Sequence, residues 1–151
     1  MTTPVRLMLD TNILSDMMRN PRGAANLSLQ RRLAEQPDLQ VAASVVVDCE
    51  ICFGLQRKGS VKLDKAYADL LQVVEILPLE GGVTPHYTRI RIHLEQAGAP
   101  IGPNDTLIAA HALALDATLV TADEEFRRVP GLKVENWLGP APIGPEQRST
   151  R

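Results

Sequence analysis

The chain has 151 residues, of which 44% are hydrophobic and 3% aromatic, as is typical of one globular domain with a single core. No apolar run approaches the roughly 20 residues that span a membrane, and the first residues lack the regions of a signal peptide, so we expect a cytoplasmic protein. The scarcity of aromatic residues argues against a base-stacking platform for RNA.

The net charge of −2 argues at first against a nucleic-acid partner. The chain has 18 acidic and 16 basic residues. If four of the acids bind metal, the remaining surface is slightly basic, which permits contact with RNA without requiring it.

Apolar strands alternate with helices along the chain, which predicts an α/β fold with a parallel sheet. Strands are expected at residues 5–9, 39–43, 74–77, 117–120 and 132–134. Helices are expected at residues 13–18, 26–36, 44–58, 63–73, 85–96 and 103–115, with a short one from residue 124. Residues 1–138 would form the domain. Residues 139–151 contain three prolines and no apolar periodicity, and are expected to form a mobile tail.

Asp10 follows the first strand and precedes a helix that is apolar on one side. An aspartate at this position can act as an N-cap, so the local sequence leaves a capping and a functional role equally open. The helix carries Ile13, Leu14, Met17 and Met18. These side chains exceed what one core obviously needs, which is an argument for a dimer.

Glu50 lies in a helix that Ser44 can cap and Gly59 can end. At helical spacing it shares an apolar face with Val46, Cys49 and Phe53. A carboxylate on a buried face needs a partner or a cation, whereas at the edge of that face it can reach water.

Two cysteines in this helix, Cys49 and Cys52, form a C-x-x-C pattern. There is no second pair and the three histidines are scattered, so we expect reduced, buried thiols rather than a zinc or redox site. Asp48 lies about 200° around the helix from Glu50 and is expected behind the site or on the surface.

Residues 101–126 contain two further acids beside buried elements. Asp105 falls in the first turn of an almost wholly apolar helix, and Asp123 follows the next strand. In open α/β sheets, ligands bind beyond the carboxyl ends of the strands. The turn that carries Asp123 also has a purely structural interpretation, in which Thr121 and Glu124 form a capping box at the start of a helix.

Asp10, Glu50, Asp105 and Asp123 therefore come from four separate segments of a βα-alternating chain. If these carboxylates converge, they repel one another, and bound cations must compensate for that repulsion. Oxygen ligands without Cys or His select Mg²⁺ or Mn²⁺. Such ions activate water and stabilise both oxygens of an in-line phosphoryl displacement, which predicts phosphodiester hydrolysis.

The sequence resembles the PIN-domain ribonucleases, and among them the VapC-type toxins of bacterial toxin–antitoxin pairs. The matching segments are MLDTNILSD at 8–16, E-x-x-x-G at 50–54, IGPNDTLIAAHALALDATLVTADEEFRRVPGL at 101–132 and ENW at 135–137. Their order and spacing agree over nearly the whole chain, short of the tail.

The resemblance implies a single PIN-like domain, with a central parallel sheet of four to five strands sandwiched by helices. It implies Mg²⁺-dependent endoribonuclease activity, with Mn²⁺ able to substitute, and a homodimer neutralised by a small antitoxin protein encoded beside it. Asp10, Glu50, Asp105 and Asp123 would be catalytic and bind the metal. Asn12 and Thr121 would be polar supports. The residues before Glu50 depart from the usual pattern, which leaves the role of Asp48 open.

Three alternatives stand beside this hypothesis. A phosphatase of the haloacid dehalogenase type needs an acid two residues after the first aspartate, where this chain has Asn12. A non-catalytic RNA- or protein-binding module on the same fold would not need all four acids. A DNA-cleaving relative would use the same chemistry, and a comparison of RNA and DNA substrates separates the two.

Overall fold

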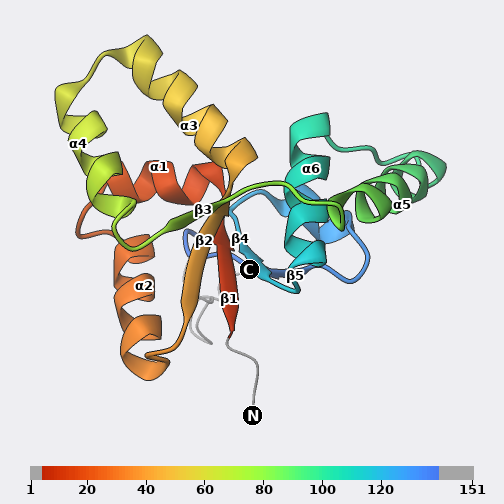
Figure 1. Ribbon diagram of the computed structural model, residues 1–151, viewed down its shortest axis with the longest axis horizontal. Coiled ribbons are helices and arrows are strands. Elements are labelled where there is room, and N and C mark those ends of the chain that lie inside the picture. The colour runs from red at the N-terminus through yellow and green to blue at the C-terminus, as the bar shows by residue number, and fades with distance from the viewer. Residues whose placement is uncertain (1–4, 140–151) are drawn as a thin grey trace, which may run out of the picture.

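The computed structural model describes residues 5–139 and has five strands that alternate with helices (Figure 1). The strands are β1 (Arg6–Leu9), β2 (Gln40–Ser44), β3 (Glu75–Leu77), β4 (Thr118–Val120) and β5 (Lys133–Glu135). The helices are α1 (Thr11–Arg19), α2 (Ala24–Glu35), α3 (Val45–Lys58), α4 (Val61–Leu70), α5 (Val83–Gln96), α6 (Pro103–Ala114) and the 3-10 helix η1 (Glu124–Arg128). Except for residue 139, the expected tail lies outside the described residues.

All four strand pairings are parallel, and the strand order is β3-β2-β1-β4-β5. The chain runs outward from β1 to β3 and then crosses back to β4, so the order reverses between β1 and β4. Helices α1 to α4 lie on one side of the sheet and α5 and α6 on the other (Figure 1). The predicted α/β fold with a sandwiched parallel sheet is confirmed.

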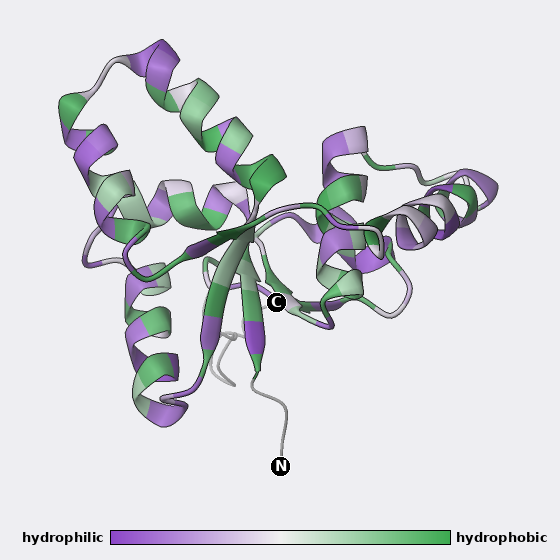
Figure 2. Cartoon of the chain, in the orientation of Figure 1, coloured by the Kyte–Doolittle hydropathy of each residue, from purple (hydrophilic) through white to green (hydrophobic). Residues whose placement is uncertain are grey.

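The central strand is buried on both faces, as parallel strands covered by helices require. Leu7, Met8 and Leu9 of β1 are almost fully inaccessible to solvent. Helix α6 is buried on most sides, as predicted, because its alanines allow close packing. Hydrophobic residues line the central strands, whereas α3 and α5 mix both classes (Figure 2).

Helix α3 buries a different face from the one predicted. Val47 and Ile51 face the core, whereas Cys49 and Cys52 are exposed and Phe53 is 64% exposed. The helix extends beyond the sheet edge (Figure 1), so much of its surface has no layer to pack against. The prediction of buried thiols and of a buried apolar face around Glu50 is therefore wrong.

The apolar side chains of α1 are used within the single chain. Ile13, Leu14, Met17 and Met18 are at most 7% exposed and belong to the main core. The sequence argument that they exceed the needs of one core is therefore wrong, and the homodimer rests on the resemblance alone. Within residues 5–139, no helix has the length and apolar character needed to cross a membrane.

Two glycines, one inside α3 and one directly after it, provide a test of its C-terminal cap. Gly59 ends the helix with φ of +64°, as predicted, whereas Gly54 lies inside it with open space around its Cα. We expect Gly59→Ala to lower the free energy of unfolding by about 1–2 kcal/mol, because alanine is strained in the left-handed region. Gly54→Ala should raise it by up to about 1 kcal/mol, because alanine favours a helix. Urea unfolding of both variants measures this, and equal effects would contradict the assignment of the cap.

Candidate active site

Asp10 lies at the carboxyl end of β1, beside the point where the strand order reverses. It is 4% exposed and caps α1 by accepting the backbone N–H of Thr11 at 2.8 Å. Its other carboxylate oxygen accepts a hydrogen bond from the Thr121 hydroxyl at 2.7 Å. Asp10 therefore does cap α1, and it also contacts Thr121 directly after the end of β4.

Asn12 and Thr121 fasten the ends of β1 and β4 to each other. The Asn12 side-chain nitrogen donates to Asp10 at 3.4 Å and to the Thr121 hydroxyl at 3.3 Å. The Asn12 side-chain oxygen accepts the backbone N–H of Ala122 at 3.0 Å. The two residues predicted as polar supports thus contact Asp10 directly.

The turn after β4 is not the capping box that the sequence suggested. The Thr121 hydroxyl accepts the N–H of Asp123 at 3.1 Å, and Asp123 itself caps η1 by accepting the N–H of Glu125 at 3.0 Å. The Thr121 oxygen accepts from Asp123 N–H and from the Asn12 side chain, so its acceptor capacity is used by these groups rather than by the Glu124 N–H of a capping box.

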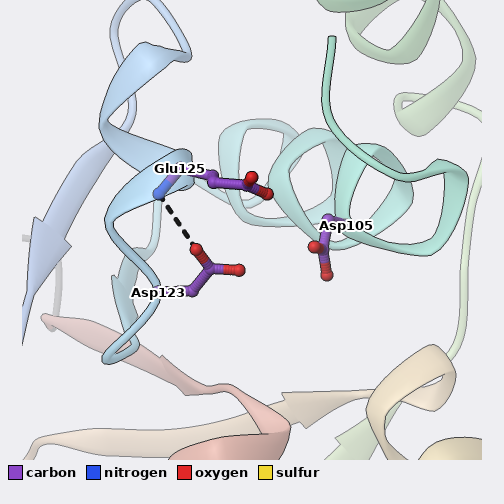
Figure 3. A group of neighbouring side chains, drawn as sticks. All are labelled: Asp105, Asp123 and Glu125. Carbon is purple, nitrogen blue, oxygen red and sulfur yellow. Dashed lines mark hydrogen bonds between the residues drawn. The ribbon is translucent and has the colours of Figure 1, made fainter.

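Asp105, Asp123 and Glu125 form a group that we call the three-acid group. One carboxylate oxygen from each lies within 4.8 Å of the others. Their side chains extend toward a common space between the start of α6 and η1 (Figure 3). Sequence reasoning missed Glu125, although its position two residues after Asp123 in a short helical turn places both acids in one segment.

Glu50 reaches the same region from α3. Its carboxylate accepts a hydrogen bond from the Thr11 hydroxyl at 2.9 Å. Thr11 is a second site residue that the sequence did not single out, although it directly follows Asp10 in the chain. Asp48 points elsewhere, because its carboxylate accepts hydrogen bonds from Tyr67 at 2.7 Å and from Cys52 at 3.5 Å.

A buried histidine links the helices that carry Glu50 and Asp105. His111 of α6 is 2% exposed, and its Nδ1 lies 2.9 Å from the Ser44 hydroxyl. Ser44 in turn caps α3 by accepting the N–H of Val46 at 3.1 Å. Burial lowers the pKa of His111, which favours the neutral imidazole in this contact.

The acids perturb one another electrostatically. The pKa of Asp105 is raised to about 6, first by burial and then by the charges of Asp10, Asp123, Glu50 and Glu125. The pKa of Asp10 is also raised by burial and by two of these charges, although its hydrogen bonds to Thr121 and Thr11 oppose the shift. The four predicted acids and Glu125 therefore lie within one electrostatic neighbourhood.

This set of donors fits a hard divalent cation. All five side chains are carboxylates, the ligands that Mg²⁺ and Mn²⁺ prefer. Among residues 5–139, the one ion pair of Lys or Arg with any of these five acids joins Arg128 and Glu125 at 4.0 Å. The protein itself therefore supplies little positive charge against their repulsion, and a bound cation would relieve it.

The raised pKa of Asp105 predicts a pH-dependent loss of stability in metal-free protein. A carboxyl whose pKa is higher in the folded state binds its proton more tightly there, so stability falls as pH rises from 3.8 to about 6. After allowance for solvent screening, the loss should be on the order of 1 kcal/mol. Asp105→Asn should remove it and be the more stable protein at neutral pH.

Urea unfolding in EDTA across this pH range tests the prediction. Asp38→Asn, at an exposed turn, is the matched control and should follow the wild type. If Asp105→Asn keeps the wild-type pH profile, the carboxyl is not perturbed by its neighbours.

Known proteins resemble this chain over most of its length. The family model of the PIN domain matches residues 7–132. Ribonuclease VapC2 of Rickettsia felis is 39% identical over 99 residues, which cover 64% of this chain and 74% of the relative. The tRNA(fMet)-specific endonuclease VapC of Salmonella typhimurium is 27% identical over 88% of this chain and 98% of its own.

A solved structure has the same fold over nearly the same length. It is VapBC2 from Rickettsia felis bound to a DNA fragment from its promoter. One of its chains superposes with a TM-score of 0.76 and 35% identity, over 88% of this chain and 99% of that one. The match of the PIN model to most of the sequence, with these relatives, establishes that the chain belongs to the PIN-domain family, among its VapC ribonucleases.

Proposed function

We propose that the protein is a divalent-metal-dependent endoribonuclease that hydrolyses RNA phosphodiester bonds and acts as the toxin of a toxin–antitoxin pair. The observation that carries the proposal is the meeting of Asp10, Glu50 and the three-acid group at one end of the sheet. The relatives are named as ribonucleases and endonucleases, which supports RNA as the substrate class. We propose that the protein acts in the cytoplasm, because a toxin that cleaves the RNA of its own cell must meet that RNA there.

Asp105, Asp123 and Glu125 would hold the metal most directly, because their oxygens are already grouped. Asp10 and Glu50 would complete its surroundings. A bound Mg²⁺ or Mn²⁺ supplies a more acidic water and charge stabilisation for in-line displacement at phosphorus.

The other polar residues keep the acids in place. Thr121 and Asn12 fix one oxygen of Asp10, and the N–H of Thr11 fixes the other. The Thr11 hydroxyl fixes Glu50. Because these donors lie in the first turn of α1 and directly after β4, the acids require little reorganisation, which is the condition for efficient electrostatic catalysis.

The complexes among the structural neighbours support an antitoxin as the protein partner. Clustered carboxylates attract an arginine, whose planar fork can pair with two oxygens. We therefore propose that the antitoxin neutralises the toxin by placing a cationic side chain, or a blocking segment, at the acids. A homodimer, as the sequence resemblance implies, is the proposed assembly.

Two neighbouring glutamates separate metal binding from general surface charge. Glu125 belongs to the three-acid group, whereas the exposed Glu124 pairs with Arg127 at 2.8 Å. We expect Glu125→Gln to reduce RNA cleavage by roughly tenfold or more, as loss of groups that support a metal does. It should also shrink the rise in melting temperature caused by Mn²⁺, because that rise follows metal affinity. Glu124→Gln should behave as the wild type in both assays.

Wild-type protein assayed with Mg²⁺, Mn²⁺ and EDTA, on RNA and on DNA of the same sequence, tests the function itself. Metal-dependent cleavage of RNA supports the proposal. RNA binding without cleavage would instead support a non-catalytic module, and preferential cleavage of DNA would support a DNA-cleaving relative.

The partner proposal predicts competition between antitoxin and metal. Addition of the protein encoded beside the toxin gene should abolish cleavage and remove the Mn²⁺-induced rise in melting temperature.

The proposed homodimer is tested separately. Light scattering at micromolar concentration should give twice the chain mass for the toxin alone. A strictly monomeric toxin, or an inhibitor that leaves the metal response intact, would contradict these expectations.

A further inference from the structure

Arg128 is a cation held loosely beside the three-acid group. It lies in η1, its side chain is 44% exposed, and its Nη1 atom is 4.0 Å from the Glu125 carboxylate. The same nitrogen donates to the backbone carbonyl of Pro100 at 3.5 Å. Both contacts are at the outer limit for such interactions, and a guanidinium has five N–H donors. Most of its hydrogen-bonding capacity is therefore free.

The neighbouring Arg127 is held differently. Its Nε donates to Glu124 at 2.8 Å, which is a short ion pair, and Glu124 lies outside the three-acid group. The two adjacent arginines of η1 thus differ in whether their guanidinium groups are already closely paired. Arg127 is paired with the exposed Glu124, whereas most N–H donors of Arg128 are free beside the candidate metal ligands.

Arg128 contacts both of the segments that contribute acids to the three-acid group. Glu125 and Asp123 belong to its own segment, whereas Pro100 belongs to the loop that leads into α6 and Asp105. The guanidinium therefore spans the two segments whose acids meet. A ligand that approaches the three-acid group from this side comes within reach of its fork.

A polyanionic substrate needs such a cation. Each RNA phosphate brings a negative charge toward a cluster of carboxylates in a chain whose net charge is −2. Guanidinium groups match phosphate oxygens with two parallel hydrogen bonds, which makes arginine the preferred residue for phosphate recognition. Phosphate contacts position a nucleic acid without reading its sequence.

We propose that Arg128 binds a backbone phosphate of the RNA beside the acidic cluster and so positions the strand for cleavage. This inference rests on the proposed function, because it presumes that RNA is the substrate. Arg128 contributes binding affinity, so its removal raises KM more than it lowers kcat. Glu125 holds the guanidinium near the site until the phosphate arrives.

The experiment compares Arg128→Ala with the matched control Arg127→Ala. Binding of a short, labelled single-stranded RNA of mixed sequence is measured by fluorescence anisotropy in EDTA, where metal-dependent cleavage cannot occur. Arg128→Ala should weaken binding by roughly tenfold, the equivalent of one charge-assisted hydrogen bond. The slope of log K against log salt concentration should become shallower by about 0.7, as expected when a protein neutralises one phosphate fewer on a single strand. Arg127→Ala should change affinity by less than about threefold.

Two further variants separate charge from loop anchoring. Arg128→Lys keeps the charge and should retain most of the affinity, whereas Arg128→Gln keeps a donor for Pro100 but should bind RNA as weakly as Arg128→Ala. Melting curves establish that each variant is folded. If Arg128→Gln binds as the wild type, or if Arg127→Ala and Arg128→Ala are equally impaired, the inference is wrong.

Failure of the inference is distinguishable from failure of the proposed function. Wild-type protein that cleaves RNA while Arg128→Ala keeps its KM and affinity contradicts the phosphate contact alone. Wild-type protein that neither binds nor cleaves RNA contradicts the function, and the inference with it.

Discussion

The hydrogen bond between the Thr121 hydroxyl and the Asp10 carboxylate is the contact on which the candidate site depends. It joins the ends of β1 and β4, the two strands between which the order of the sheet reverses. Parallel pairing alone would bring these strand ends together, but it would not fix the direction of a repelled carboxylate. Thr121 does so from a buried position, and the same oxygen orders the turn that carries Asp123.

The arrangement is costly because it concentrates negative charge where solvent is partly excluded. The raised pKa values of Asp105 and Asp10 express this cost. The packed core offsets it: β1 is buried on both faces, and His111 with Ser44 connects α6 to α3. The centre of the sheet thus stabilises the fold while one end of it destabilises the fold, as is common for sites that must bind a charged ligand.

Much of the fold follows from local patterns in the sequence. The alternation of apolar strands and helices predicts the parallel sheet, and the placement of Asp10 and Asp123 after strands predicts where they meet. The exposure of Phe53 and both cysteines could not be predicted, because it depends on how far α3 extends beyond the sheet. The prediction for the α1 side chains is wrong for a related reason: a spacing pattern identifies a buried face but not which surface covers it.

The candidate site itself was only partly predictable. Four acids follow from their positions relative to strands and helices, and Asn12 and Thr121 from the resemblance. Glu125 could not be ranked above its neighbour Glu124, since both lie in the same short helix and only their directions differ. The orientation of Asp48 toward Tyr67 is likewise a tertiary contact that helical geometry alone does not specify.

The order of the segments also has a meaning for synthesis of the protein. β1 emerges from the ribosome early, whereas its partner strand β4 and the turn that carries Asp123 and Glu125 are made much later, since Thr121 lies 111 residues after Asp10. The hydrogen bond from Thr121 to Asp10 can therefore form only after the intervening strands and helices have been synthesised. A product that ends before α6 lacks Asp105, Asp123 and Glu125, so a message broken upstream of the α6 codons would yield only fragments without the complete set of acids.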